Sequence, residues 1–365
     1  MHPLEKLARG CLVVVVVAGV YLLFWPVPIR PRAWRPPADP GESGPYVANA
    51  DLARAALVSM GNAPDDVSPE TAALDPRDGR IYTGLANGWI VRLDPASGRV
   101  ERVADVGKRP LGIVVAPDGT LYVAHTTRGV LAIGADGKAR PVADCGADPL
   151  RGFTDSLVLA ADGAIWFTCP SRRFDVDDIR FDAMEARRTG RLMRHDPATG
   201  RTSVELEGLQ FANGVAMAPD DAFVLVNEWN GYRVTRLWLS GPRRGRRDVF
   251  IENLPGYPDN IHLDAKGLYW VGLVVRRNAA VDRLHPHPFL MKILPRIPEA
   301  LQPHAPKFGW LIALDANGRV VRNLQDATGH TDQVTGALRV GDDLWVTSNS
   351  MPAIARVAVP PELRL

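Results

Sequence analysis

The chain has few of the residues that build disulfide-bonded or zinc-binding domains, with 3 cysteines among 365 residues. No Cys/His zinc pattern occurs. No Gly-x-Ser-x-Gly motif occurs either, which argues against a serine hydrolase with a nucleophile elbow. The formal net charge is only +2, so the charge balance gives no argument for a nucleic-acid partner. With 46% hydrophobic and 23% charged residues, the composition is that of a globular protein with a large buried core.

The cysteines leave a disulfide undecided. Cys11 lies within an apolar segment near the N-terminus. Cys145 and Cys169 are able to pair if the domain is exported, but nothing in their spacing demands it. Two buried free thiols are the interpretation that we prefer from the sequence.

Long hydrophobic runs are scarce, with one exception near the N-terminus. Residues 11–25 are uncharged and strongly apolar, and no small-x-small cleavage site follows them. Extended to residue 29, the stretch reaches about the length that spans a bilayer. We therefore expect a basic segment at 1–10, a transmembrane signal anchor at 11–29 and a Pro-rich linker at 30–48. This arrangement predicts a single-pass membrane protein with its folded domain outside the cytoplasm, on the periplasmic or extracytoplasmic side.

Turns, in contrast, are abundant, and the chain has 33 Gly and 31 Pro. Short alternating runs rich in Val, Ile, Leu, Tyr and Trp are separated by Asp-Gly, Asn-Gly or Ser-Gly turns. The unit repeats about every 45 residues where no insertion intervenes, which is the size of a four-stranded propeller blade. A β-sandwich would not need the same turn at the same phase in every unit. The pattern therefore predicts an all-β fold, a six-bladed β-propeller over residues 49–365.

Two insertions interrupt the repeats. Residues 172–189 are expected to form a short helix, and residues 276–307 are longer, basic and interrupted by Pro. Insertions between propeller strands cover one mouth of the ring, so a lid over a site is one interpretation. A packed surface loop is another. A third is contact with a membrane surface through Phe289, Leu290, Ile293 and Leu294.

Polar residues recur at one phase of the repeat, four positions before the last large apolar residue of the first strand. In the two remaining repeats, Leu111 and Val334 take that place. The innermost strands of a propeller line its axis, so these side chains should converge at one mouth. Clustered carboxylates repel one another without a cation, and carboxylate and amide oxygens suit Ca²⁺. The alternative is that they cap backbone amides at turns and strand edges. The predicted metal ligands are Glu70, Asp155, Asn213, Asp259 and the adjacent Asn260.

Candidate bases are less sharply marked. His125 ends a strand, and His262 lies within the strand that follows Asn260. His330 and Asp332 lie just before the sixth inner strand and hence near the same mouth. A lone histidine is more often a structural residue than a catalytic one, so these assignments are weaker than the ligand set.

Two segments carry a resemblance to a known family. FANGVAMAPDDAFVLVNEWNGYRVTRLWLSGP at 211–242 and VFIENLPGYPDNIHLDAKGLYWVGL at 249–273 resemble the strictosidine synthase-like conserved region. The superfamily includes gluconolactonases, regucalcin-like proteins, paraoxonases and proteins similar to the adipocyte plasma membrane-associated protein. The resemblance extends over most of residues 60–358. It implies a six-bladed propeller.

The resemblance also implies site residues. The catalytic calcium of the paraoxonase and gluconolactonase branch would be bound here by Glu70, Asn213, Asp259 and Asn260. The third-blade ligand is usually Asn, whereas this chain has Asp155. Strictosidine synthase uses a catalytic Glu near the sixth inner strand, where this chain has the shorter Asp332. The second-blade segment RPLGI lacks the histidine of paraoxonases, so the resemblance assigns no general base.

Together these observations predict a Ca²⁺-dependent hydrolase of lactones or aryl esters. Ca²⁺ would polarise the ester carbonyl, Asn213 and Asn260 would orient the substrate and stabilise the oxyanion, and Asp259 or a histidine at the mouth would activate water. One alternative is a Pictet–Spengler-type synthase that uses Asp332. Another is a propeller that binds a ligand or partner without turnover. The expected partners are a small ester or lactone and a membrane contacted by the N-terminal helix.

Overall fold

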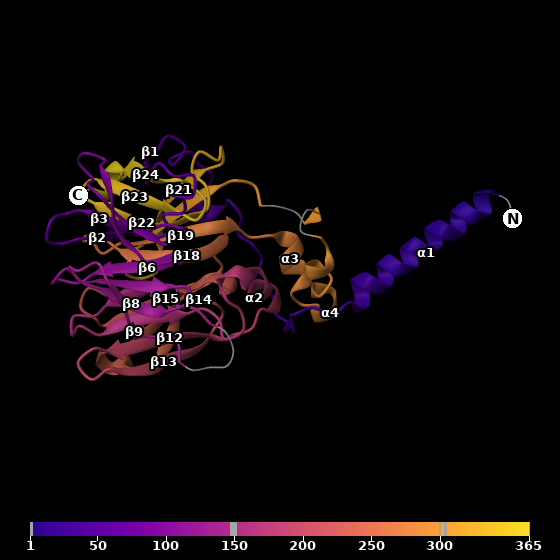
Figure 1. Cartoon of the computed structure of the whole chain (residues 1–365), viewed down its shortest axis with the longest axis horizontal. Coiled ribbons are helices and arrows are strands. Elements are labelled where there is room, and N and C mark those ends of the chain that lie inside the picture. The colour runs from indigo at the N-terminus through magenta and orange to yellow at the C-terminus, as the bar shows by residue number, and fades with distance from the viewer. Residues whose placement is uncertain (1–2, 147–151, 299–300, 303–304, 365) are drawn as a thin grey trace.

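The computed structural model describes residues 3–146, 152–298, 301–302 and 305–364. Parts of the expected segments 1–10 and 276–307, namely 1–2, 299–300 and 303–304, lie outside the described residues. The described strands form six antiparallel sheets of four strands each. Figure 1 shows these sheets packed side by side, with the helices gathered at one end of the molecule.

Five sheets are each built from four consecutive strands, which we number as blades 1 to 5. Blades 1 and 2 contain β2 (Ala73–Leu74), β3 (Ile81–Gly84), β4 (Trp89–Leu93) and β5 (Val100–Asp105), then β6 (Pro110–Val115), β7 (Leu121–His125), β8 (Gly129–Ile133) and β9 (Ala139–Ala143). Blades 3 and 4 contain β10 (Leu157–Leu159), β11 (Ile165–Cys169), β12 (Gly190–Asp196) and β13 (Arg201–Leu209), then β14 (Ala212–Met217), β15 (Phe223–Glu228), β16 (Arg233–Trp238) and β17 (Arg247–Ile251). Blade 5 contains β18 (Gly256–Leu263), β19 (Tyr269–Arg276), β20 (Gly309–Leu314) and β21 (Val320–Asp326).

Blade 6 joins the two ends of the propeller. It contains β22 (Val334–Val340), β23 (Asp343–Ser348) and β24 (Ala353–Ala358), and its outermost strand is β1 (Ala56–Ser59). Strand β1 pairs antiparallel with β24, with Ala56 opposite Arg356. The first strands of the blades contact one another in the order β2, β6, β10, β14, β18, β22 and back to β2, which closes a ring. The predicted six-bladed β-propeller is therefore confirmed.

The repeat pattern located the inner strands because each must bury one face against its neighbours. The last large apolar residue of each unit falls inside its inner strand: Leu74, Val115, Leu159, Met217, Leu263 and Leu338. Trp270, Trp310 and Trp345, on middle strands of blades 5 and 6, are fully buried between sheets. Large aromatic rings supply much of the apolar area that stabilises such packing.

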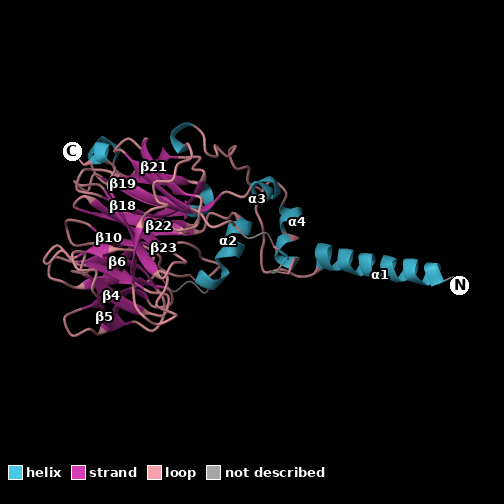
Figure 2. Ribbon diagram, turned by 90° about the horizontal axis from the view of Figure 1, so that it is seen from above, coloured by secondary structure: helices cyan, strands magenta, loops and turns pink. Residues whose placement is uncertain are grey.

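The two insertions lie at one mouth of the ring. The first contains η2 (Val176–Asp178) and α2 (Ile179–Glu185) and follows β11; the second contains α3 (Ala279–Leu284), α4 (Pro288–Met291) and η5 (Leu294–Arg296) and follows β19. Because the end of β19 pairs with the start of β18, this mouth is the one where the inner strands begin. Figure 2 shows α2, α3 and α4 together on that side. The other described 3₁₀ turns are η1 (Gly44–Tyr46), η3 (Trp229–Gly231), η4 (Gly241–Arg243) and η7 (Pro361–Leu363).

The N-terminal helix α1 (Pro3–Phe24) extends away from the propeller beside α4 (Figures 1 and 2). It ends before Pro26, and the residues that follow do not continue it: Ile29 is buried against the insertions. The buried Arg296 caps its C-terminus, donating from Nη1 to the carbonyl oxygen of Leu22 at 2.8 Å and from Nε to that of Trp25 at 2.7 Å.

The expected transmembrane span at 11–29 therefore does not form as one helix. The apolar part of α1, from Cys11 to Phe24, is about 21 Å long at ~1.5 Å per residue, against a hydrocarbon core of ~30 Å. Within the described residues, no helix combines the length and the hydropathy needed to cross a membrane.

A disulfide joins Cys145 and Cys169, whose Cα atoms are 6.0 Å apart. The prediction of free thiols was therefore wrong. Cys145 follows the outer strand of blade 2, whereas Cys169 ends the second strand of blade 3. The two meet only because neighbouring blades pack, and a spacing of 24 residues in the sequence does not reveal that contact.

Candidate functional site

The predicted ligand residues come from blades 1, 3, 4 and 5 and meet near the ring axis. All five are buried, with between 2% and 6% of their surface exposed: Glu70, Asp155, Asn213, Asp259 and Asn260. Burial raises the pKa of Asp259 well above its ordinary range, and the charges of Glu70 and Asp155 raise it further. The pKa of Asp155 is raised in the same way, first by burial and then by Glu70. The three carboxyl groups thus lie close enough to repel one another when ionised.

Four oxygens of this cluster accept no hydrogen bond within the described residues, although one of them, Glu70 Oε2, is in ion-pair contact with Arg109. Glu70 Oε2, Asp155 Oδ1, Asn213 Oδ1 and Asp259 Oδ1 are buried, and none has a hydrogen-bond partner among the residues that the structure describes. We call these atoms the open oxygens. Buried polar atoms in folded proteins are nearly always paired, so four open oxygens at one place call for an explanation.

The chemistry of this set fits a hard cation. Side-chain oxygens from carboxylates and amides are the ligands that Ca²⁺ takes, with variable geometry and with water completing its shell. In the described part of the chain, however, no three His, Cys, Asp or Glu side chains stand close enough to hold a metal as they are. The cluster therefore contains suitable ligand atoms, but they stand farther apart than the ligands of a bound cation.

Asn260 differs from the four open residues because its amide braces the ring. Its Nδ2 donates to the backbone carbonyl of Glu70 at 3.0 Å, which links blade 5 to blade 1. Thr335 of blade 6 donates to the same carbonyl at 2.6 Å. Gly214, beside Asn213, lies so near blade 5 that an added Cβ would stand 2.4 Å from the carbonyl oxygen of Asp259. These contacts hold the inner strands in register around the cluster.

Sequence reasoning missed Arg109, which reaches the cluster from the residue before β6. Its Nη2 lies 3.1 Å from Glu70 Oε2, in ion-pair contact, and the same nitrogen donates to Asn349 Oδ1. The guanidinium charge lowers the pKa of Glu70, Asp155 and Asp259, against the larger opposing effect of burial. The second-blade segment RPLGI contains Arg109, but nothing in the sequence indicates that its side chain contacts Glu70 in another blade.

The predicted histidine bases are held by backbone groups. His125 is buried, and its Nδ1 accepts hydrogen bonds from the amides of Thr127 at 3.1 Å and Arg128 at 3.2 Å. Its Nε2 then carries the proton and donates to the carbonyl of Val106 at 3.2 Å. His330 is exposed, and its Nε2 lies 2.8 Å from the carbonyl of Ala55. The geometry thus favours structural roles for both residues, and their catalytic role stays a prediction.

Asp332 also lies at this mouth, with both carboxylate oxygens engaged. Oδ1 accepts from the amide of Phe308 at 3.1 Å, and Oδ2 accepts from the hydroxyl of Ser350 at 3.1 Å. The side chain therefore ties the start of β20 to the loop after β23. This bonding leaves it less suited to acid–base chemistry than the open oxygens.

His262 differs from the other histidines discussed because it has a buried ring nitrogen that accepts and donates no hydrogen bond within the described residues. Its Nε2 is buried and, within the described residues, finds no hydrogen-bond partner. Burial lowers the pKa of His262 to about 4, so the ring is neutral near pH 7. It lines an axial cavity of about 460 Å³ together with Thr71 and Ser156, which directly follow Glu70 and Asp155 in sequence. The cavity thus begins beside the cluster and extends along the ring axis.

On the insertion side, aromatic rings cover the cluster. Phe153, Phe211, Trp229 and Tyr257 form a chain of ring contacts with centroid separations of 6.2, 5.3 and 4.4 Å. Val176 of the first insertion packs on the same group. This apolar cover is suited to exclude water from the mouth of the site.

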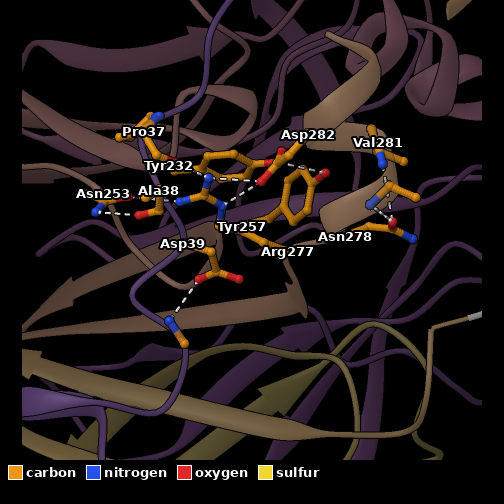
Figure 3. A network of polar contacts seen from close by, with 12 residues as sticks. Pro37, Ala38, Asp39, Tyr232, Asn253, Tyr257, Arg277, Asn278, Val281 and Asp282 are labelled. Atoms are coloured by element: carbon orange, nitrogen blue, oxygen red, sulfur yellow. Dashed lines mark hydrogen bonds and ion pairs between the residues drawn. The ribbon is translucent and has the colours of Figure 1, made fainter.

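The Pro-rich linker is hydrogen-bonded to the propeller beside the second insertion, as Figure 3 shows. Arg277 donates from Nε and Nη2 to Asp282 Oδ2 at 3.0 and 2.8 Å, and from Nη1 to Asn253 Oδ1 at 2.8 Å. Asn253 in turn donates to the carbonyl of Ala38 at 2.9 Å, and Tyr232 donates to Asp282 Oδ1 at 2.9 Å. The network fixes the N-terminal linker and α3 to the propeller.

Comparisons of sequence place the chain among known proteins. The family model described as strictosidine synthase matches residues 155–242, and the one described as strictosidine synthase-like, N-terminal, matches residues 44–93. Strictosidine synthase-like protein 6 of Arabidopsis thaliana is 33% identical over 288 residues, which are 77% of this chain and 76% of that protein. The adipocyte plasma membrane-associated protein of Bos taurus is 32% identical over 302 residues, 76% of this chain and 73% of that protein.

Solved structures share the fold at lower identity. A gluconolactonase of Xanthomonas campestris superimposes with a TM-score of 0.59 and 17% identity over 85% of this chain and 91% of that one. The calcium-binding protein regucalcin of Agrobacterium tumefaciens gives a TM-score of 0.59 at 16% identity, covering 84% of this chain and 94% of that one. These structures support the propeller, while the family follows from the sequence relatives. The chain belongs to the strictosidine synthase-like family.

Proposed function

We propose that this protein is a hydrolase of lactones or aryl esters that uses Ca²⁺ held at the axial cluster. The observation that carries the proposal is the set of open oxygens, because four buried acceptors from four blades accept no hydrogen bond within the described chain. Solved structures of this fold include a protein named as a gluconolactonase and one named as a calcium-binding protein. Those names support the reaction class and the cation.

Four residues would hold the metal: Glu70, Asp155, Asn213 and Asp259. A bound Ca²⁺ would supply a Lewis acid that polarises the ester carbonyl. The protein itself would position the ligands, exclude water and accept the proton. Asn260 keeps the backbone of Glu70 in place, and the aromatic cover excludes bulk water from the reacting ester. Asp259 would also accept a proton from the attacking water, through the carboxylate oxygen that the metal does not take.

Family membership makes condensation of an amine with an aldehyde the second candidate. Strictosidine synthase-like relatives support it, and Asp332 would be its acid. Both oxygens of Asp332 accept hydrogen bonds from neighbouring groups, whereas the open oxygens do not. We therefore rank hydrolysis first.

We further propose that α1 attaches the protein to a membrane, with the propeller outside the cytoplasm. Apolar side chains of α1, among them Val14 and Phe24, are more than 60% exposed. Relatives are named as plasma membrane-associated proteins. The disulfide between Cys145 and Cys169 supports an oxidising compartment. Cell fractionation with carbonate extraction, followed by thiol labelling before and after reduction, tests both parts.

The function is tested by metal analysis and esterase assays on the full-length protein. Phenyl acetate and a small lactone are assayed with and without a calcium chelator, using Glu70→Gln as the site variant. Glu101→Gln, on the outer strand of the same blade, is the matched control. Stoichiometric calcium and chelator-sensitive turnover that is lost only in Glu70→Gln would support the hydrolase. Turnover that survives both chelation and Glu70→Gln would overturn it.

A further inference from the structure

Blade 2 contributes a cation to the cluster where other blades contribute oxygens. Leu111 occupies the ligand position of that blade, and Arg109, two residues earlier, extends to Glu70. The side chain of Arg109 is 24% exposed and that of Glu70 only 8% exposed, so the pair is shielded from most solvent. Screening by water is therefore weak, and the charge of the guanidinium acts strongly on the cluster.

Formal charges match this cation to the ligand set. Ionised Glu70, Asp155 and Asp259 together with Arg109 leave the cluster with a charge of minus two, which one divalent cation neutralises. The family resemblance predicts Asn where this chain has Asp155. The extra negative charge of Asp155 is therefore offset by the positive charge of Arg109.

A guanidinium and a metal compete for the same oxygen. Ca²⁺ binds oxygens at ~2.3–2.6 Å, and an oxygen held that closely by a dication is a poor partner for a second cation. Arg109 also has a second hydrogen-bond partner, because the same Nη2 donates to Asn349 Oδ1 in the loop after β23. Its Nε, moreover, is buried without a partner in the part of the chain that the structure describes. Arg109 is thus incompletely satisfied in its present position.

Building on the proposed function, we propose that Arg109 is an internal cation that Ca²⁺ displaces from the cluster. Metal binding transfers Glu70 Oε2 from the guanidinium to the metal, and Asn349 retains Arg109 at the mouth. Calcium binding is then an exchange of cations, and its affinity is set by the balance between Asp155 and Arg109. This makes Arg109 a positioning residue that acts on the metal through Glu70.

The experiment is calcium titration calorimetry on the full-length protein, whose readout does not depend on turnover. Arg109→Met removes the competing charge and should tighten calcium binding by about tenfold or more, while Asp155→Asn should weaken it by a similar factor. The double variant restores the formal charge and should return to within about threefold of the wild type. Arg109→Lys keeps the charge and should stay near the wild type. Arg128→Met, an exposed arginine of the same blade, is the control.

Asn349→Ala provides a second variant that leaves Arg109 in place. Without Asn349, Glu70 is the remaining partner of the guanidinium. Calcium then competes with a stronger ion pair and should bind several-fold more weakly. Thermal melts of each variant with and without calcium check folding. The rise in Tm on adding calcium should be larger in Arg109→Met than in the wild type, even if that variant is less stable without metal.

The outcomes separate this inference from the proposed function. Calcium affinity that is unchanged or weaker in Arg109→Met, or unchanged in Asn349→Ala, overturns the exchange while wild-type binding still supports the hydrolase. Calcium bound by Arg109→Met but not by the wild type overturns both the exchange and the proposed function, since Arg109 is then a permanent occupant that calcium does not displace. Calcium bound by neither protein overturns both.

Discussion

Two groups of buried or half-buried carboxylates lie toward the same mouth of this propeller, and they differ in their hydrogen-bond partners. One is the axial cluster and the other is the network that fastens the insertions and the linker. The axial cluster contains Glu70, Asp155 and Asp259, and the insertion network contains Asp182, Glu185 and Asp282.

In the insertion network, donors surround each carboxylate. Asp182 accepts from the Ser171 hydroxyl at 2.5 Å and from Asn230 Nδ2 at 3.0 Å. Glu185 pairs with Arg173 Nε at 2.7 Å. The folded chain therefore supplies the partners that these carboxylates require, and they need no ligand.

In the axial cluster, the carboxylates repel one another and their open oxygens accept no hydrogen bond within the described chain, although Arg109 forms an ion pair with Glu70. Burial and composition are alike in both groups, so neither property distinguishes a binding site from a structural network. The difference lies in hydrogen-bond satisfaction, which is costly to forgo unless a ligand restores it.

The largest effect is expected where the complete network is broken. Asp282→Ala leaves the buried Arg277 guanidinium without its main partner, and loss of one member of a buried ion pair lowers the free energy of unfolding by about 3–5 kcal/mol. Urea unfolding measures the change. Asp39→Ala is the control, because Asp39 lies in the linker (Figure 3) but is exposed and accepts only a local hydrogen bond from Gly41. Equal stability of the two variants would contradict the network's role.

A pH-dependent effect of similar size is expected from Asp182. Burial raises its pKa in the folded protein from 3.8 to about 7. Between these values the folded state holds a proton that the unfolded state has lost, so stability falls as pH rises from about 4 to about 7, by up to ~4 kcal/mol. Asp182→Asn keeps both hydrogen-bond partners and should flatten this slope. Unfolding by urea at pH 5, 6, 7 and 8 tests it, and an unchanged slope in the variant would rule out Asp182 as the source.

Breaking the axial cluster should affect activity and stability in opposite directions. Asp259→Asn removes a repelling charge, so without calcium the variant should be more stable than the wild type by roughly 1–2 kcal/mol. Its turnover of phenyl acetate should nevertheless fall by about 100-fold or more, because a ligand and the proposed proton acceptor are lost. Thermal melts in chelator and steady-state kinetics in calcium measure the two effects. A variant that is less stable without calcium would show that the cluster is a structural network after all.

Calcium binding by the wild type should also strengthen with pH. Burial and mutual repulsion raise the pKa of Asp155 and Asp259, so the metal must displace protons from the cluster. Calorimetry in buffers of different ionisation enthalpy detects the released protons. Binding without proton release at pH 6 would contradict the repulsion that defines the cluster.

The ring and the positions of the four cluster residues could be predicted because both repeat. One phase relation placed the six inner strands, and the same phase placed Glu70, Asp155, Asn213 and Asp259 at their starts. A repeat multiplies a weak local signal, since each copy must satisfy the same packing. Features that occur once had no such support.

Arg109, the disulfide and the end of α1 are features of this second kind. Arg109 acts through an ion pair with Glu70 in another blade, and Cys145 meets Cys169 only across a blade boundary. Helix α1 ends at Phe24 because the next residues pack on the insertions, a tertiary contact that hydropathy does not report. The hydrogen bonds of His125 could not be predicted for a related reason, since its partners are backbone groups that no residue pattern marks.

His125 offers the smallest expected effect on activity and the sharpest test of the comparison. If its ring belongs to a satisfied structural network, His125→Asn should leave kcat/KM for phenyl acetate within about twofold while lowering stability by ~1–3 kcal/mol, as buried backbone groups lose their partners. A catalytic base would behave in the opposite way, with lost turnover at nearly unchanged stability. His330→Asn, at the exposed pair with Ala55, should change neither quantity appreciably. A fall of 100-fold or more in His125→Asn would return the catalytic role to this residue and show that hydrogen-bond satisfaction does not separate structural from functional groups here.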